Sequence, residues 1–554
     1  MAKALPAHYS ASCAFSVFCV NLLPMPAKRL MPRRRFLGLC GGAVAAHWIA
    51  SAQPSAPARP NILVFLVDDM GWQDTSLPFW RKPTAFNRHY RTPNMERLAH
   101  QGIRFTNAHA HPVCSPTRVS IMTGQNPARH HVTNWIFGPG KDTSAAWGPV
   151  ASPPDWRMQG LQPGDLTLAG ILRDAGYYTI HCGKAHWGAH GTPGADPRNL
   201  GFDVNIAGHA AGAPASYQGL DDYGNKDEKR APWAVPGLDK YHGTDVHLTD
   251  ALTLEAVQSL ETAAKSGKPF YLHMAHYAVH MPIQPHGRFH SHYENRNYAG
   301  ADYDIPPVEE DYASMIEGMD ASLGALLDKL DQLGVARNTL VIFTSDNGGL
   351  SAHARGLTPR GTGLNTHNWP LKAGKGSAYE GGTRVPFIAA WAKPDTDNPL
   401  QRSLPIRPGS QSDRPVISED LFPTILGLAE AQDLIPKNHP VDGQDIRPYL
   451  AKTSHDPGRP LIVHYPHIWG PKGPGYEPHS SIRTGKWKAV YFYIPRRWEL
   501  YNLDHDLSEE DGLAAAHPKK LRQLAARLNS ALVEMKAQWP TNRQTGQPLP
   551  LRLP

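Results

Sequence analysis

The chain has 554 residues, which is enough for a large buried core and, by length alone, for about three or four domains or for one large α/β domain with a smaller companion. Its formal net charge of +7 is concentrated at one end. Six basic residues precede residue 53, where no Asp or Glu occurs, and subtracting these six from +7 leaves +1: Lys3, Lys28, Arg29, Arg33, Arg34 and Arg35. Composition therefore gives no reason to expect a nucleic-acid partner, which would require a basic surface on the folded part of the chain.

Residues 1–52 have the pattern of an export leader. The run Arg33-Arg34-Arg35-Phe-Leu precedes a moderately apolar stretch at 38–49, and Ala-Ser-Ala at 50–52 has the small-x-small form of a cleavage site. The pattern resembles a twin-arginine export signal, so we expect a periplasmic or secreted protein whose mature chain begins near Gln53. If this leader is an export signal, Met25 or Met31 is the expected first residue of the translated chain. The apolar stretch is shorter than the ~20 residues that span a bilayer, so we expect no stable membrane anchor; an uncleaved leader retained as a membrane anchor is the alternative.

Cysteine usage fits an exported chain without a disulfide framework. Three of the five cysteines fall in the leader, at positions 13, 19 and 40, and only Cys114 and Cys182 remain. Two separate thiols are the first interpretation, and a bridge between them is the alternative.

After a Pro/Ala/Ser-rich linker at 53–60, two kinds of apolar pattern alternate along the chain. Continuous apolar runs of strand length occupy 61–67, 177–181, 269–275 and 339–344, and helical periodicity occupies 93–101, 166–175, 249–265 and 309–333. Continuous apolar strands are typical of parallel sheets that are covered on both faces. The alternation predicts a doubly wound α/β domain over 61–450.

The last part of the chain, 451–554, has a different texture. Short strand-like pieces at 461–464, 481–483, 487–493 and 498–503 precede a helical stretch at 518–539. This order predicts a smaller α+β domain with an antiparallel sheet and a C-terminal helix.

Polar side chains follow each of the four strands predicted for the large domain. They are Asp68 and Asp69, Lys184 and His186, His276 and His280, and Asp346 and Asn347. Open α/β sheets form their sites at the carboxyl ends of strands, so these side chains are candidates for one site. The carboxylates and the amide offer only oxygen ligands, which favours a hard cation, Ca²⁺ or Mg²⁺, over zinc.

Residues 114–124 place a thiol in a small, polar and basic frame. The run Cys114-Ser-Pro-Thr-Arg118, followed by Ser120, Thr123 and Gly124, resembles the maturation signature of type I sulfatases, in which the cysteine is oxidised to Cα-formylglycine. Further pieces are similar to the motifs of that family: Asn61-Ile-Leu with Asp68-Asp69, Gly183-Lys-Ala-His-Trp-Gly188, His280-Met-Pro282, Ser345-Asp-Asn-Gly348 and Gly374-Lys375-Gly376 with Tyr379-Glu-Gly-Gly382. The resemblance covers nearly the whole chain after residue 60. It implies an alkaline phosphatase-like fold, with a doubly wound mixed sheet flanked by helices.

The resemblance also implies a role for each candidate residue. The ion, Ca²⁺ or alternatively Mg²⁺, is expected to bind Asp68, Asp69, Asp346, Asn347 and one oxygen of the modified Cys114. The hydrated formylglycine at 114 is the expected nucleophile, and Arg118, Lys184 and Lys375 are expected to offset the negative charge of the sulfate. His280, with His276 as the alternative, would protonate the leaving alcohol, and His186 would accept the proton from the second hydroxyl as sulfate is expelled.

The implied activity is that of a sulfuric ester hydrolase acting on sulfate monoesters of carbohydrates, with aryl sulfates as the alternative. Its expected partners are a small-molecule or oligosaccharide sulfate ester and a formylglycine-generating maturase. Two other functions remain open at this point: a phosphonate monoester or phosphodiester hydrolase of the same superfamily, and an unmatured protein that binds sulfated glycans without catalysis.

Overall fold

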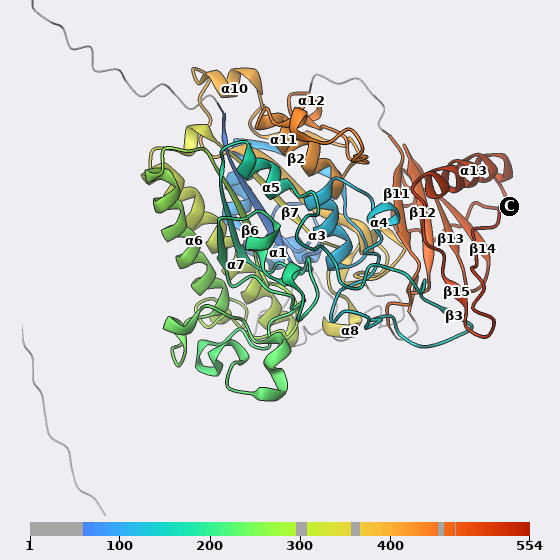
Figure 1. The fold of residues 1–554 in the computed structure, drawn as a ribbon. Helices are drawn as coiled ribbons and strands as arrows, with labels where there is room; N and C mark the ends of the chain where they lie inside the picture. Colours follow the sequence, from blue (N-terminus) through green and yellow to red (C-terminus); the bar gives the residue numbers. More distant parts are fainter. Residues whose placement is uncertain (1–58, 295–306, 356–365, 453–458, 471–472) are drawn as a thin grey trace, which may run out of the picture. The chain divides into compact units, whose positions relative to one another are not determined.

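The computed structural model describes residues 59–294, 307–355, 366–452, 459–470 and 473–554 (Figure 1). The predicted leader and most of the predicted linker lie outside the described residues. Within the described ranges, no helix combines the length and the apolar character needed to cross a membrane.

A nine-stranded sheet forms the centre of the molecule. Its order is β10-β2-β8-β7-β1-β6-β4-β5, and β9 pairs with β2. The strands are β1 (Asn61–Val67), β2 (Gly102–His109), β4 (Tyr178–Gly183), β5 (Val204–Ile206), β6 (Phe270–Ala275), β7 (Thr339–Ser345), β8 (Arg384–Trp391), β9 (Ser410–Ser412) and β10 (Val416–Ile417). β1 runs parallel to β6 and β7, and β4 runs parallel to β6, whereas β8 is antiparallel to both β7 and β2. The prediction of a mixed sheet is confirmed, and the carboxyl ends of β7, β1, β6 and β4 meet at one edge.

The two faces of the sheet are covered by different helices, as the alternation of side chains along a strand requires. In β1, Leu63 and Phe65 belong to a core shared with α2 (Pro93–Gln101), α6 (Leu248–Lys265) and α7 (Pro307–Gln332). Ile62 and Val64 point the other way, into a core shared with α3 (Cys114–Thr123), α5 (Leu168–Asp174) and α11 (Leu421–Leu428). Both cores are fully buried along β1, which explains its continuous apolar sequence.

Shorter elements complete the large domain. They are α1 (Ala85–His89), α4 (Pro127–His130), α8 (Ala352–Arg355), α9 (Glu380–Thr383), α10 (Pro399–Ser403) and α12 (Arg447–Leu450). A two-stranded pairing of β3 (Val150–Ala151) with β15 (Thr541–Asn542) joins the end of the chain to a loop of the large domain.

A second sheet, antiparallel and four-stranded, contains β11 (Leu461–Tyr465), β12 (His479–Thr484), β13 (Trp487–Phe492) and β14 (Arg497–Asn502). One face packs against α13 (Pro518–Glu534) through residues that include Leu521, Leu524 and Leu528. The other face packs Val490 and Phe492 against Ala378 and Tyr379 of the large domain. The smaller C-terminal α+β unit is therefore present. Its helix ends five residues before the predicted end, and Lys536, two residues past the helix, has a positive φ of 58°. The domain boundary at 450 stays a prediction.

Candidate active site

Adjacent strand ends bring the predicted acidic residues together. Val67 of β1 pairs with Ser345 of β7, so Asp68 and Asp346 emerge side by side. The Asp346 N–H donates to Val67 O (3.1 Å), and Asp346 Oδ1 accepts from the Asp69 N–H (3.1 Å). Asn347 Nδ2 donates to Asp69 Oδ1 at 2.7 Å. All four side chains are fully buried. Buried carboxylates of like sign are costly unless cations compensate them.

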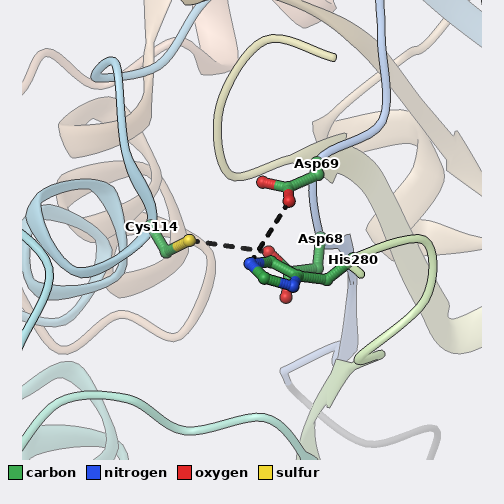
Figure 2. A group of neighbouring side chains, drawn as sticks. All are labelled: Asp68, Asp69, Cys114 and His280. Carbon is green, nitrogen blue, oxygen red and sulfur yellow. Dashed lines mark hydrogen bonds and ion pairs between the residues drawn. The ribbon is translucent and has the colours of Figure 1, made fainter. Parts of the chain in front are cut away.

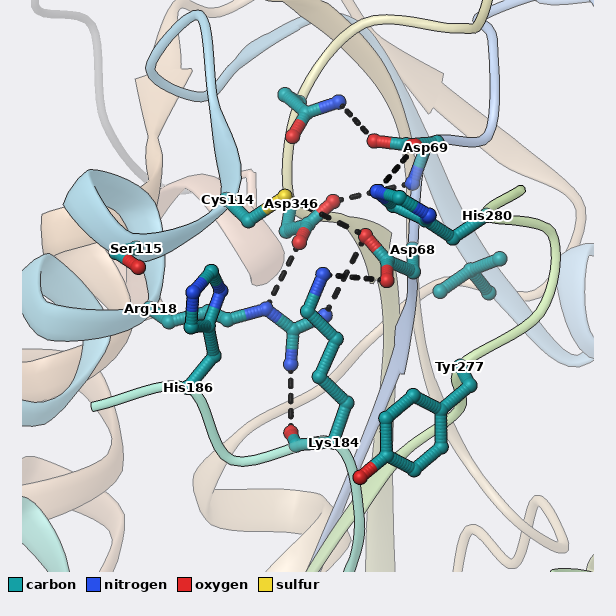
Figure 3. A network of polar contacts seen from close by, with 12 residues as sticks. Asp68, Asp69, Cys114, Ser115, Arg118, Lys184, His186, Tyr277, His280 and Asp346 are labelled. Carbon is teal, nitrogen blue, oxygen red and sulfur yellow. Dashed lines mark hydrogen bonds and ion pairs between the residues drawn. The ribbon is translucent and has the colours of Figure 1, made fainter. Parts of the chain in front are cut away.

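Helix α3 carries the thiol and the arginine of the signature on one face (Figure 3). Cys114 is the first residue of the helix, and its Sγ lies 3.7 Å from Asp68 Oδ1. Arg118 lies one turn later, where a side chain stacks over that of residue 114. Its Nε donates to Asp346 Oδ2 (2.8 Å) and its Nη1 donates to Lys184 O (2.7 Å). The helix thus fixes the spacing between the thiol, the guanidinium and the aspartates.

The two cysteines of the described chain are both free, and both are buried. Cys182 lies in β4, where its thiol faces Leu252 O at 3.4 Å. The alternative of a bridge between Cys114 and Cys182 is therefore not what the structure contains.

Four side chains bring potential metal-ligand atoms close together (Figure 2). One ligand atom from each of Asp68, Asp69, Cys114 and His280 lies within 4.8 Å of the other three. Next to this cluster, Asn347 Oδ1 is buried with no hydrogen-bond partner in the described part of the chain. Carboxylate oxygens and an orphaned amide oxygen fit a hard cation. His280 was not among the predicted ligands, whereas Asp346 is predicted but is turned toward Arg118 and the Asp69 N–H.

Two buried lysines neutralise the paired aspartates. Lys184 Nζ lies 2.5 Å from Asp68 Oδ2, and Lys375 Nζ lies 2.8 Å from the Asp69 carboxylate. Burial raises the pKa of Asp69, but Lys375 and His280 outweigh it and hold that pKa below its usual range. For Asp68 burial dominates, with a further contribution from Asp346, and the pKa is raised well above its usual value. The two aspartates therefore differ, since the neighbouring cations favour the ionised form of Asp69 and burial favours the protonated form of Asp68.

His280 and His186 both line the site, and their hydrogen bonds decide which ring nitrogen is available. His280 Nδ1 lies 2.8 Å from Met281 O, and a carbonyl only accepts, so Nδ1 donates. Nε2, 3.4 Å from Asp69 Oδ2, is the ring nitrogen that faces the cluster. His186 Nε2 donates in the same way to Ile136 O (2.7 Å), which leaves Nδ1 without a hydrogen-bond partner among the described residues. Burial, with the charge of Lys184, lowers the pKa of His186 well below its usual value.

The alternative histidine, His276, lies elsewhere. Its Nε2 contacts Ser322 Oγ at 2.9 Å, and its ring packs against Phe65 with the ring centroids 5.1 Å apart. Burial lowers its pKa to about 3. Of the two histidines, only His280 belongs to the cluster around Cys114.

A cavity of about 190 Å³ opens above these groups. Its lining combines Cys114, His186, His280 and Lys375 with Trp135, Gly212, Ala213, Trp233 and Trp469. The tryptophans were not predicted from the sequence, because they come from three separate segments of the chain with no common spacing. A larger cavity of about 990 Å³ contains none of the predicted site residues.

Comparison with known proteins gives the family. The model of the sulfatase family matches residues 60–431. This chain belongs to that family, as a type I sulfatase of the alkaline phosphatase-like superfamily. It is accordingly a sulfuric ester hydrolase.

Similar proteins support this assignment over most of the chain. A sulfatase of Formosa agariphila is 29% identical over 540 residues, covering 89% of this chain and 91% of its own. The N-acetylgalactosamine-6-sulfatase of Mus musculus is 31% identical, covering 81% of this chain and 75% of its own. Among solved structures, Ps i-CgsB in complex with k-i-k-neocarrahexaose is 26% identical, with a TM-score of 0.64, and covers 89% of this chain and 95% of its own.

Proposed function

We propose that this protein hydrolyses sulfate monoesters of carbohydrates, with Cα-formylglycine formed from Cys114 as the nucleophile and Ca²⁺ as the resident ion. The observation that carries the proposal is the position of Cys114: the first residue of α3, at the floor of a cavity, with Sγ in a cluster that includes Asp68, Asp69 and His280. When formed, formylglycine supplies a hydrated aldehyde, of which one hydroxyl attacks sulfur and the other later expels sulfate and restores the aldehyde.

Asp68, Asp69, Asp346 and Asn347 would hold the ion, together with an oxygen of the modified residue 114. The orphaned Oδ1 of Asn347 and the paired carboxylates support a cation with oxygen ligands. Ca²⁺ is preferred, with Mg²⁺ as the alternative. The ion would supply positive charge next to the nucleophile and the bound sulfate.

The remaining groups bind the sulfate and move protons. Lys184, Lys375 and Arg118 place three cations against the cluster, and preorganised cations of this kind stabilise charge that develops in the transition state. His280 Nε2 is suited to donate a proton to the departing alcohol. His186 Nδ1 is suited to accept the proton of the second hydroxyl.

Export and maturation complete the proposal. The leader pattern at 1–52 supports transport to the periplasm or the exterior, and the run Cys114-Ser-Pro-Thr-Arg118 supports recognition by a formylglycine-generating maturase. Sulfated carbohydrates are favoured because relatives of this chain act on or bind them, including the N-acetylgalactosamine-6-sulfatase of Mus musculus and Ps i-CgsB with its bound oligosaccharide.

The test is the chemical state of residue 114 in active protein. The full chain is produced together with a maturase, and the peptide that contains residue 114 is analysed by mass spectrometry beside a sulfate-release assay. We expect the mass of the aldehyde, turnover of sulfate esters, and faster hydrolysis of aryl sulfates than of phosphodiesters. Cys114→Ala should have no turnover above background, and Cys114→Ser should fail in the same way unless a serine-type maturase is present.

Cys182→Ala is the matched control, since it removes the other buried thiol of the described chain without touching the cluster. It should keep most of the activity, and both variants should remain folded by circular dichroism. Substantial turnover by purified Cys114→Ala, or an intact thiol in active protein, contradicts the proposal.

A further inference from the structure

The cavity above Cys114 has an aromatic wall that the chemistry at sulfur does not require. Three half-buried tryptophans line it: Trp135, Trp233 and Trp469. They come from different parts of the chain, since Trp135 follows α4, Trp233 ends the 3-10 helix Glu228–Trp233, and Trp469 follows β11. The only other lining side chains, apart from Ala213, are Cys114, His186, His280 and Lys375. The described part of this wall therefore offers flat apolar faces and no charge of its own.

Packing behind the wall holds two of the indoles in place. Phe137 stands behind both: its ring centroid lies 6.4 Å from that of Trp135, edge to face, and 5.4 Å from that of Trp233. The backbone carbonyl of Trp135 accepts from Thr143 Oγ1 (2.6 Å), and that of Trp233 accepts from the Ala215 N–H (2.7 Å). Aromatic pairs prefer particular orientations, so packing against Phe137 favours one orientation of each of these two indoles.

Trp469 lies beside Lys375, the lysine proposed to bind the sulfate. The Lys375 ammonium lies 5.5 Å from the centroid of the Trp469 ring. The next residue, Gly376, has a φ of 84°, and a Cβ at this position would lie 2.1 Å from Trp469 Cγ. The absence of a side chain at 376 is what lets the indole approach the backbone next to Lys375.

The size and the lining of the cavity restrict the alcohol part of a substrate. A volume of about 190 Å³ is below the roughly 300–1,000 Å³ of pockets that enclose larger ligands. A space of this size suits one ring better than several, and the indoles offer a surface for the apolar face of that ring. Lys375 is the one lysine or arginine among the described lining residues, and the proposed function assigns it to the sulfate that is cleaved. A second sulfate or a carboxylate on that ring would therefore meet indole surface without a cation of its own in the described lining, and burying an unpaired charge is costly.

We infer that the alcohol bound beside Cys114 is a single uncharged ring, either a neutral sugar or a phenol, and that Trp135, Trp233 and Trp469 select it against rings that carry a further anionic group. This inference rests on the proposed function, because it concerns the same site and the same sulfate ester.

The experiment compares a matched pair of substrates on the matured full-length enzyme. N-acetylglucosamine 6-sulfate and N-sulfoglucosamine 6-sulfate differ only in the group on nitrogen, which is neutral in the first and anionic in the second. We expect kcat/KM to be at least about tenfold higher for the neutral member. A third arm with 4-nitrophenyl sulfate distinguishes a phenol from a sugar as the preferred ring.

Two variants test the wall itself. Trp233→Ala should raise KM for the neutral substrate by about tenfold and change kcat much less, because stacking holds the ring in the ground state and the transition state alike. Trp233→Phe should keep most of the affinity. Trp135→Ala is the second variant, in case loss of Trp233 disturbs the fold. Trp498 of β14, whose Nε1 donates to Arg552 O, is the matched control, and Trp498→Ala should leave KM unchanged.

The outcomes separate the inference from the function on which it rests. Equal or faster hydrolysis of the N-sulfo substrate, or a KM for both wall variants no different from that of Trp498→Ala, overturns the inference while leaving a working sulfatase. Failure of the matured wild-type enzyme to release sulfate from any of the three esters overturns the proposed function instead.

Discussion

At the scale of single residues, hydrogen-bond partners decide which atoms of the site are available for chemistry. The Met281 carbonyl occupies Nδ1 of His280, and the Ile136 carbonyl occupies Nε2 of His186. Each histidine therefore presents one defined nitrogen, and the two lie in the lining of the same cavity as Cys114. Two histidines that each present a different ring nitrogen to the same cavity are suited to act as one proton donor and one proton acceptor.

The assignment of His280 as the leaving-group acid predicts a dependence on the leaving group. His280→Gln should lower kcat for a sugar sulfate by about 10²–10³-fold, and should affect 4-nitrophenyl sulfate far less, because 4-nitrophenolate departs without a proton. Steady-state kinetics on the two esters measure the difference. The matched variant His276→Gln disturbs a buried histidine outside the cluster, so any loss should be similar for both esters. If His276→Gln alone shows the leaving-group dependence, the roles of the two histidines are exchanged.

Site residues that lie in a recognisable sequence motif could be predicted, whereas residues that join the site only through the path of the loops could not. Asp68, Asp346 and Lys184 follow recognisable buried strands, so their position at one sheet edge could be argued in advance. His280 was expected as an acid but not as a neighbour of the paired aspartates, because its reach toward Asp69 depends on the path of the loop after β6. The aromatic wall depends on three loops meeting in space, for which the sequence has no periodicity.

At the scale of secondary structure, α3 is the element on which the site depends. All ten of its residues are buried, so its sequence lacks the alternation of polar and apolar faces by which a helix is recognised. Pro116 lies in its first turn, where no backbone hydrogen bond is lost. For this reason the segment was not predicted as a helix, although the motif within it was recognised. Strand β8 was not predicted either, because it contains Pro386 and because it begins within a glycine-rich motif.

The end of α3 gives a prediction about stability. Gly124 has a φ of 69°, and a Cβ there would lie 2.5 Å from Phe422 Cδ1 of the neighbouring helix α11. Gly124→Ala should therefore lower the free energy of unfolding by about 2–4 kcal/mol, from the left-handed backbone together with overpacking. Gly140 is the matched control, since its φ is 73° and nothing lies within 4 Å of a Cβ. Gly140→Ala should cost only about 1 kcal/mol. Urea denaturation measures the free energy of unfolding of both variants. Equal losses would mean that Phe422 moves away from the added Cβ without a cost in stability.

At the scale of the whole molecule, the C-terminal sheet supports the loop that carries Lys375. Tyr379 packs against Phe492, and Glu380 contacts Lys488 of β13 (3.1 Å) and Arg483 of β12 (3.3 Å). Lys488 also lies 2.8 Å from Glu509. Burial raises the pKa of Glu380, but Lys488 and Arg483 outweigh it and hold that pKa well below its usual range. A buried ionic network thus joins the two sheets directly behind the active-site loop.

Removing one charge from this network should lower the free energy of unfolding. Lys488→Met leaves two buried carboxylates without their shared partner, and we expect a loss of about 3–5 kcal/mol in the free energy of unfolding, together with a lower kcat. The double variant Lys488→Met, Glu509→Gln removes one of those carboxylates and should recover part of the stability. Denaturation curves and activity measured on the same samples check both. A double variant no more stable than the single one would mean that the two side chains are not coupled.

The general architecture was predictable because the central strands are apolar throughout, which only a sheet covered on both faces explains. The smaller antiparallel sheet was likewise predicted from its short strand-like pieces. Its contact with the Lys375 loop was not predicted, since the partners are more than a hundred residues apart and neither the apolar face nor the ion pairs of this contact have a sequence motif.

The burial of Cys114 has a consequence for the order of events during biosynthesis. Cys114 is only 2% exposed and lines one cavity together with three indoles and Lys375. The loop that carries Lys375 rests on strands made among the last hundred residues. A second enzyme has little access to that sulfur once the chain has closed around it. If the thiol is converted to an aldehyde, the conversion belongs to the interval in which residue 114 has left the ribosome and β12 to β14 have not yet taken their place. Slowing translation of the C-terminal third should therefore increase the share of molecules that acquire the aldehyde.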